Sequence, residues 1–231
     1  MSGSEPLQPA PDDETVCLEG FHAVKHALRF GAELLEVRTG DRDRLAALAR
    51  ELAPDVAEPL LALAEPGPGP FPPTGVVARA RRPQFELPPP SDRFTVLLDR
   101  PRHLGNLGAA IRVAAAAGAA AVLVTGEADP WHRHAIRGAA GLQFALPVGR
   151  VANPPDDLPL VALDPEGDPP RPLPPGAVLA FGSERHGLSP ALLARADARI
   201  ALPMRPGVSS LNLATAVAAA LYGLTRTPRP A

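Results

Sequence analysis

The sequence predicts an α/β fold with a parallel sheet in its C-terminal part, and one segment indicates this most directly. Phe94–Asp99 (FTVLLD) and Ala121–Val124 are short apolar runs of the kind that form buried strands. Between them, Gly105–Gly108 opens a helix that we expect to end near Ala117. A strand, a helix and a second strand in this order form a crossover unit, which joins parallel strands.

The same alternation continues to the C-terminus. Further strands are predicted near Phe144–Val148, at Leu158–Leu163, just before Gly182 and at Ile200–Leu202, and further helices at Ala135–Ala140 and from Leu211. For the last helix, Ser209 or Ser210 is the expected N-cap, because a hydroxyl can accept a hydrogen bond from the free N–H groups of the first turn. Leu211, Ala214, Ala218 and Leu221 would form its apolar face.

Residues 14–82 predict a smaller α/β domain in front of the larger one. Phe21, Val24 and Leu28 recur at helical spacing, and a second amphipathic helix covers Arg44–Leu52. Strands are expected at Leu34–Val37 and Gly75–Ala78. The polar, Pro-containing residues 1–13 are expected to form a flexible tail, and the Pro-rich residues 83–93 a linker to the second domain, residues 94–231.

The charge is divided unequally along the chain. Residues 1–90 hold 9 Lys/Arg against 14 Asp/Glu, a net charge of −5, whereas residues 91–231 hold 14 against 11, a net charge of +3. A polyanion such as a nucleic acid would therefore bind more readily to the C-terminal part. Ordinary variation of surface charge is the alternative reading of this division.

Cysteine content and hydropathy suggest a compartment. Cys17 is the only cysteine, which excludes an intrachain disulfide and fits a reducing environment. The most apolar run, Leu211–Leu224, is shorter than the ~20 residues that span a bilayer. We therefore expect a cytoplasmic protein without a membrane partner.

The first segment that could carry chemistry is Asn106–Arg112. Gly105 and Gly108 allow a ligand to approach the backbone, and Arg112 would project from the loop-proximal part of the helix, about one and a half turns in if Asn106 or Leu107 caps it. A guanidinium there suits phosphate or carboxylate. An N-cap asparagine with an arginine in a surface ion pair is the structural alternative.

The second segment is Gly182–Gly187 (GSERHG), which follows a strand. A P-loop would need Lys and Ser/Thr after the second glycine, where Leu188 and Ser189 stand. A hydrolase nucleophile elbow would need a glycine at Arg185. Both chemistries are therefore excluded, and a turn with Glu184 at its tip remains. That carboxylate could also be structural, paired with a nearby arginine.

The third segment is Val208–Leu213 (VSSLNL), at the start of the last helix. Asn212 falls in the expected first turn, where asparagine has low helix propensity and needs a polar partner. A capped core helix accounts for part of this pattern without any chemistry.

Taken in order, the three segments resemble the motifs of one family: the SpoU, or TrmH-like, RNA ribose 2′-O-methyltransferases of the SPOUT superfamily. The resemblance covers residues 94–231. The matching residues are Asn106, Gly108 and Arg112 for the first motif, Gly182, Glu184, Gly187 and Leu188 for the second, and Pro203, Met204, Ser210, Leu211 and Asn212 for the third. More weakly, Gly20–Val24 and Thr74–Ala78 resemble the N-terminal RNA-recognition domain of this family.

The resemblance implies a fold, a cofactor and partners. Members of the family thread the C-terminal segment into a deep trefoil knot, bind S-adenosylmethionine there and pair as homodimers. It implies no metal, and an RNA substrate, with rRNA favoured over tRNA. The implied catalytic residues are Arg112, Asn106, Glu184, Ser210 and Asn212, and the implied cofactor-binding residues are Gly182, Leu202, Leu211, Pro203 and Met204.

This chain also departs from the family pattern. His103-Leu104 stands where Asn-Pro is frequent, Ala139 replaces a frequent serine, and the helix expected after the Phe144–Val148 strand is cut short by residues 151–158. These departures concern the substrate more than the three motifs. Two alternatives stay open: a catalytically silent RNA-binding homologue, and an enzyme that methylates rRNA to confer antibiotic resistance.

Overall fold

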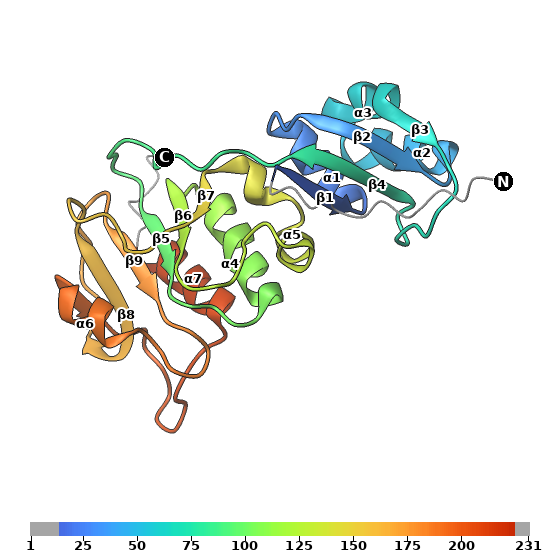
Figure 1. Ribbon diagram of the computed structural model, residues 1–231. Helices are drawn as coiled ribbons and strands as arrows, with labels where there is room; N and C mark the ends of the chain where they lie inside the picture. The colour runs from blue at the N-terminus through green and yellow to red at the C-terminus, as the bar shows by residue number, and fades with distance from the viewer. Residues whose placement is uncertain (1–13, 225–231) are drawn as a thin grey trace, which may run out of the picture.

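The computed structural model describes residues 14–224, which build two sheets joined by an extended segment (Figure 1). The first sheet has four strands in the order β1-β4-β2-β3 and the second has six in the order β10-β8-β9-β5-β6-β7. The chain is thus α/β throughout, as predicted.

The four-stranded sheet belongs to the N-terminal part. Its strands are β1 (Thr15–Glu19), β2 (Leu34–Thr39), β3 (Ala64–Pro66) and β4 (Val76–Arg81), and its helices are α1 (Phe21–Arg29), α2 (Arg42–Leu52) and α3 (Ala57–Leu63), with a short 3₁₀ turn, η1 (Pro54–Val56). β4 pairs antiparallel with β1 and β2, whereas β2 and β3 are parallel. Burial alternates along β1 and β4, because only one face of this sheet meets the core.

The six-stranded sheet is parallel at every pairing, which confirms the predicted crossover topology. Its strands are β5 (Thr95–Leu98), β6 (Ala121–Val124), β7 (Val148–Arg150), β8 (Leu160–Asp168), β9 (Val178–Phe181) and β10 (Ala198–Ile200). Every residue of β5, β6 and β9 is buried, because layers of side chains cover both faces of a parallel sheet.

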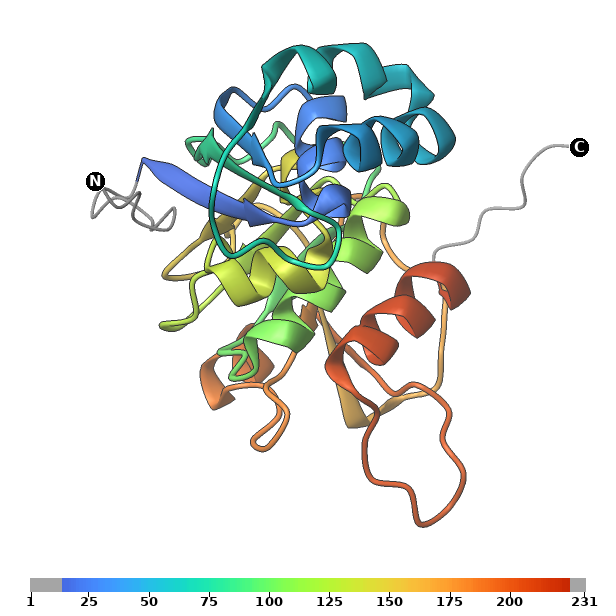
Figure 2. The same ribbon diagram turned by 90° about the vertical axis from the view of Figure 1, so that its right-hand side faces the viewer.

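Helices cover this sheet unequally. The helices are α4 (Leu104–Ala116), α5 (Arg133–Ala139), α6 (Pro190–Arg195) and α7 (Leu213–Gly223), with a 3₁₀ turn, η2 (Leu142–Ala145). α4 packs against both α5 and α7, and α7 also contacts β9. Leu192 of α6 and Leu188 join a separate buried cluster with Leu97 and Leu123. Figure 2 shows the segment between β10 and α7 projecting away from this body.

Several element boundaries differ from those predicted. Phe144 lies in η2, and β7 starts only at Val148, because the α5 helix ends in two left-handed residues, Ala140 and Gly141, that turn the chain. The predicted strand at Ile200–Leu202 ends at Ile200. The predictions also missed the short elements β1, α3, β3 and α6 and the two 3₁₀ turns.

The two sheets share one continuous apolar core. The buried cluster runs from Leu18 and Val24 in the N-terminal part to Ile111 and Ile136 in the C-terminal part. Across the junction, His26 Nδ1 lies 2.8 Å from the carbonyl oxygen of Ala140. Additional ion pairs link Arg133 to Glu19 and Arg82 to Asp129, each at 3.0 Å.

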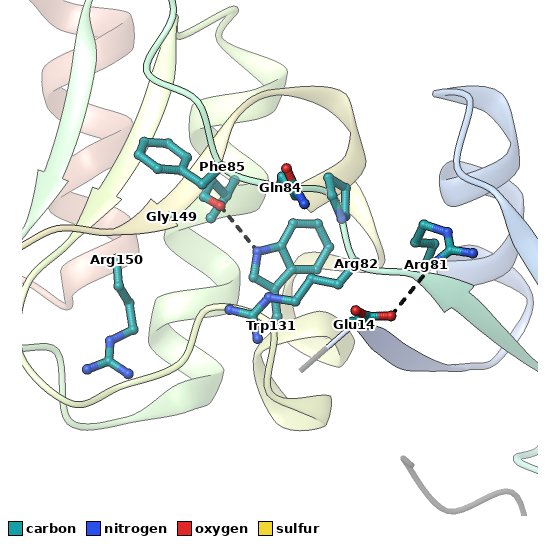
Figure 3. A pocket seen from close by; sticks show the side chains of 10 residues that line it. Glu14, Arg81, Arg82, Gln84, Phe85, Trp131, Gly149 and Arg150 are labelled. Atoms are coloured by element: carbon teal, nitrogen blue, oxygen red, sulfur yellow. Dashed lines mark hydrogen bonds and ion pairs between the residues drawn. The ribbon is translucent and has the colours of Figure 1, made fainter. Parts of the chain in front are cut away.

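The segment between the sheets lies against the second sheet. Residues 82–94 contain no helix or strand, and Phe85 contacts Gly149 of β7 (Figure 3). Trp131 lies next to this contact, and its Nε1–H donates to the Val148 carbonyl at 3.2 Å. A cavity of about 570 Å³ opens here, and the charges of Arg81 and Arg82 at its rim are paired with carboxylates. The linker therefore covers an edge strand that would otherwise be open.

Within residues 14–224, no helix combines the length and the apolar character that crossing a bilayer requires.

Candidate functional site

The carboxyl ends of β5 and β9 lie side by side, because these strands are parallel neighbours in the sheet. β5 leads into α4, which carries the first motif, and β9 leads into the Gly182–Gly187 turn. α7, which follows the third motif, packs against both α4 and β9. All three predicted segments therefore meet at one edge of the sheet, where open α/β sheets bind their ligands.

A chain of side-chain hydrogen bonds joins one residue from each segment. Asn106 Nδ2 donates to Glu184 Oε1 at 3.0 Å, and Asn212 Nδ2 donates to Asn106 Oδ1 at 3.0 Å. Asn212 Oδ1 in turn accepts the backbone N–H of Ala214 at 2.9 Å. The three residues are 78 and 106 positions apart in sequence, so only the tertiary fold can bring them together. We call Glu184, Asn106 and Asn212 the polar chain.

Asn212 is the N-cap of α7, which corrects the expectation of Ser209 or Ser210. Its Oδ1 accepts hydrogen bonds from two N–H groups of the first turn, and the helix begins at Leu213. Ser210 is exposed and lies three residues before the helix. The buried face of α7 consists of Leu213, Val217, Ala220 and Leu221. Of the predicted face only Leu221 belongs to it: Ala214 and Ala218 are half-buried, and Leu211 is 39% exposed and precedes the helix.

Asn106 does not cap α4, and this also moves Arg112. The N-cap is His103 and the helix begins at Leu104, so Arg112 is the ninth helical residue, more than two turns in rather than one and a half. Six residues separate Arg112 from Asn106, or about 9 Å along the axis and a different face of the helix. Arg112 is exposed and, within the part of the chain that the structure describes, makes no hydrogen bond or ion pair.

The charge of Arg112 instead acts on α1. Burial is the main reason that the pKa values of His22 and Lys25 are lowered. Neighbouring cations add to it, Lys25 for His22 and Arg29 for Lys25, and the charge of Arg112 adds the smallest part in both cases. The structure thus brings Asn106, Glu184 and Asn212 together and leaves Arg112 beside the N-terminal part.

Glu184 is held as a carboxylate. Its partial burial raises its pKa, but hydrogen bonds from Asn106 and from the backbone N–H groups of Glu184, Arg102 and His103 outweigh burial and hold the pKa below its usual value. Arg102 N donates to Glu184 Oε2 at 3.3 Å. The partner of Glu184 is therefore an asparagine and backbone, not an arginine side chain. An ionised Glu184 accepts hydrogen bonds and does not supply a proton near neutral pH.

The turn that carries Glu184 depends on Gly182. Ser183 and Gly187 exchange two backbone hydrogen bonds of 3.0 and 3.1 Å, which close the turn. A Cβ atom at Gly182 would lie 2.0 Å from the Gly187 carbonyl carbon. Gly182 is therefore required by the close approach of the returning chain, whatever else it contacts.

Sequence reasoning missed a buried carboxylate next to this turn. Asp99 is 2% exposed and accepts hydrogen bonds from Thr125 Oγ1 at 2.6 Å and from the Ser189 N–H at 2.7 Å. It thereby ties the ends of β5 and β6 to the residues that follow Gly187. The available signal was an acidic residue that directly ends an apolar strand, FTVLLD.

The residues expected to hold a cofactor lie on the segment between β10 and α7. Leu202 and Met204 are half-buried, and Pro203 and Leu211 are exposed. No described residue accepts a hydrogen bond from the backbone N–H of Leu202 or Met204. Free backbone donors beside apolar side chains suit the adenine and ribose of a nucleoside, so this segment fits S-adenosylmethionine.

Metal-ligating side chains are not grouped in this way. Among residues 14–224, no three His, Cys, Asp or Glu side chains are placed to hold a metal ion.

Comparison with known proteins places this geometry in a family. The family model described as "SpoU rRNA Methylase family" matches residues 93–222. The 23S rRNA (uridine(2479)-2′-O)-methyltransferase of Streptomyces viridochromogenes is 31% identical over 90% of this chain and 81% of its own length. An uncharacterized tRNA/rRNA methyltransferase from Synechocystis sp. is 34% identical over 67% of this chain.

A solved structure extends the similarity to the fold. The SpoU methyltransferase AviRb from Streptomyces viridochromogenes, in complex with AdoMet, matches with a TM-score of 0.73 at 28% identity, over 90% of this chain and 88% of that one. Our chain spans about three fifths of the Synechocystis relative. The matched family model covers more than half of the chain, including all three segments of the site. The expected resemblance is thus confirmed, and the chain belongs to the SpoU rRNA methylase family.

Proposed function

We propose that this protein transfers the methyl group of S-adenosylmethionine to a ribose 2′-hydroxyl of structured RNA, with rRNA favoured over tRNA. The observation that carries the proposal is the polar chain Glu184–Asn106–Asn212, which unites all three motif segments at one sheet edge. Support for the reaction comes from the name of the Streptomyces relative, and support for the cofactor from the AdoMet complex. Such an enzyme would act in the cytoplasm.

The cofactor would be held by the segment between β10 and α7, together with the Gly182 turn. Leu202 and Met204 would contact it through backbone N–H groups, with Pro203 and Leu211 along the same segment. When bound, S-adenosylmethionine supplies an electrophilic methyl group. A knotted path of residues 201–224 belongs to the same proposal, supported by the return of the chain from edge strand β10 to α7 beside β9.

The side chains would divide the remaining work. A ribose hydroxyl is a weak nucleophile, so negative charge on its oxygen must be stabilised as its proton passes to a water molecule. Arg112 is fully protonated in proteins, and we assign it the positioning of an RNA phosphate and the stabilisation of the 2′-oxygen. Asn106 and Asn212 would orient the nucleotide, with Glu184 fixing the Asn106 amide and Ser210 adding a hydroxyl.

Arg112 and Asn106 of the polar chain lie on different faces of α4, so a single protomer does not bring them to the same point. A homodimer resolves this separation if Arg112 of one protomer faces the polar chain of the other. We therefore propose a homodimeric enzyme whose reaction centres each draw on both chains.

Two measurements test the proposal. Calorimetry should detect S-adenosylmethionine binding to the protein, and labelled methyl groups should enter a bacterial 23S rRNA transcript. Arg112→Ala should abolish the transfer and leave cofactor affinity within a few-fold. A protein that binds RNA but neither binds the cofactor nor transfers methyl groups would be the silent homologue instead.

The dimeric centre has its own test. Arg112→Ala and Asn106→Ala should each be inactive, but a refolded mixture should regain activity, because a mixed dimer retains one centre with both residues intact. No recovery in a mixture shown to contain mixed dimers would place both residues in one chain's centre.

A further inference from the structure

Helix α1 carries a row of basic side chains and has no carboxylate of its own. His22, Lys25 and Arg29 stand at positions i, i+3 and i+7, which lie on one face of a helix. The helix sequence FHAVKHALR contains no Asp or Glu. Lys25 is also the only lysine of a chain that otherwise uses arginine for its permanent cations.

Lys25 is an unusual cation because it is buried without an ion pair. Its side chain is only 9% exposed, and its nearest aromatic contact is the Phe21 ring, 5.6 Å from Nζ. Within residues 14–224 the Nζ atom of Lys25 makes no hydrogen bond and no salt bridge. This atom is not completely buried, so the ammonium group reaches solvent. Lysines are almost never this buried unless they are paired.

The carboxylate nearest to this row is already engaged. Asp55 of η1 accepts two hydrogen bonds from Arg29, both at 2.6 Å. Burial lowers the pKa of Lys25, the charges of Arg29 and Arg112 lower it further, and Asp55 opposes them only in part. Burial and the neighbouring Lys25 and Arg112 likewise lower the pKa of His22.

Arg112 approaches this row from the other part of the chain. It is exposed and unpaired in the described structure, and its charge acts on both His22 and Lys25. Packing fixes this approach, because α1 and α4 both contact η2. Next to η2, His26 contacts the Ala140 carbonyl at 2.8 Å, and a Cβ at Gly141 would be 2.5 Å from the Ala23 carbonyl oxygen. We call Lys25 and Arg112 the junction cations; His22, whose lowered pKa leaves its imidazole neutral near pH 7, lies beside them with an N–H donor.

Cations that are crowded together and partly desolvated destabilise the fold unless an anion binds among them. A phosphate diester carries one negative charge and two free acceptor oxygens, which suits an ammonium and a guanidinium side by side. We infer that Lys25 and His22 of α1, together with Arg112 of α4, bind a backbone phosphate of the RNA substrate. The inference rests on the proposed function, since that function supplies the RNA.

This site gives the N-terminal part a direct contact with RNA although residues 1–90 carry a net charge of −5. Local geometry matters more than the total, because the acidic side chains of residues 14–82 are absent from the α1 row. Binding of this phosphate would also position the RNA next to Arg112, which the proposed mechanism needs beside the reacting ribose.

The salt dependence of RNA binding tests the site. Each phosphate contact contributes roughly 0.7–0.9 to the slope of log K against log salt concentration. With a bacterial 23S rRNA transcript, Lys25→Met should weaken binding and reduce the slope by about one contact. Arg44→Gln removes the same charge from an exposed site on α2 and should leave both unchanged. Lys25→Arg should recover most of the affinity.

A stability measurement separates this role from packing. Methionine keeps the unbranched apolar stem of Lys25, so Lys25→Met should raise the midpoint of thermal unfolding as it weakens RNA binding. An unchanged salt slope for Lys25→Met would overturn the inference, as would a Lys25→Met protein that is less stable and binds RNA normally. Calorimetry with S-adenosylmethionine and methyl transfer by the unaltered protein report separately on the proposed function.

Discussion

The carboxyl edge of the parallel sheet and the junction where α1 and α4 both pack on η2 differ in how their polar side chains are paired. At the sheet edge, Glu184, Asn106 and Asn212 each hold a partner at about hydrogen-bond distance, and Asp99 accepts from three residues. At the junction, Lys25 and Arg112 have no carboxylate partner within the described chain. Helix α4 contributes to both regions, with Asn106 on one of its faces and Arg112 on another.

This difference separates two requirements of a nucleic-acid enzyme. Groups that must hold reacting atoms in place gain from a complete network, since a satisfied network is rigid. Groups that bind a polyanion keep their charge available until the ligand arrives. The sheet edge therefore contributes to stability, whereas the junction cations reduce it.

The largest expected effect is on α4, the helix that both regions share. A Cβ at Gly108 would lie 2.1 Å from the Ala135 carbonyl oxygen, where α4 packs on α5. Gly108→Ala should cost about 3 kcal/mol or more in the free energy of unfolding, and both regions should fail together. Gly105→Ala, two residues into the same helix and free of contacts within 4 Å, should instead stabilise by about 0.5–1 kcal/mol. Urea unfolding measures both, and equal effects would contradict this packing.

A smaller effect is expected for Asn212, which belongs to the polar chain and caps α7. Asn212→Ala removes the N-cap and the hydrogen bond to Asn106, which should cost about 1 kcal/mol of stability and nearly all methyl transfer. Ser210→Ala provides the matched control, because Ser210 is exposed and outside the helix. Its thermal unfolding midpoint should not change; a loss of stability equal to that of Asn212→Ala would return the capping role to the serine.

The smallest expected effect is the pH dependence of Glu184. Its folded-state pKa lies below its unfolded value, so its contribution to stability is complete above the unfolded pKa and is lost as the pH falls through the folded one. The stability difference between the unaltered protein and Glu184→Gln should therefore shrink on acidification from pH 6 toward pH 3. Unfolding free energies across this range measure it. A difference that grows on acidification would contradict the assignment.

Sequence patterns predicted the parallel sheet well because its strands are continuous apolar runs between Gly- and Pro-marked loops, as β6 at Ala121–Val124 illustrates. β3 and α6 were missed because three and six residues are too few to set a period against tertiary context. At the site, motif order predicted the meeting of Asn106, Glu184 and Asn212. It did not predict which face of α4 carries Arg112, because that depends on where the helix begins.

The cap of α7 shows the same limit. Ser209, Ser210 and Asn212 all have N-cap propensity, and only the partner supplied by Asn106 from a distant helix selects Asn212. The junction cations also escaped the sequence, since Lys25 and Arg112 are 87 positions apart and neither belongs to a pattern that pairs them.

The most direct test of the account is a map of ribose methylation across total RNA from cells with and without the gene. We expect one 2′-O-methylated nucleotide in structured rRNA to disappear without the gene and to return with the unaltered protein but not with Arg112→Ala. Identical maps, or the loss of a base methyl group in place of a ribose methyl group, would contradict the assignment of this chain as a ribose 2′-O-methyltransferase.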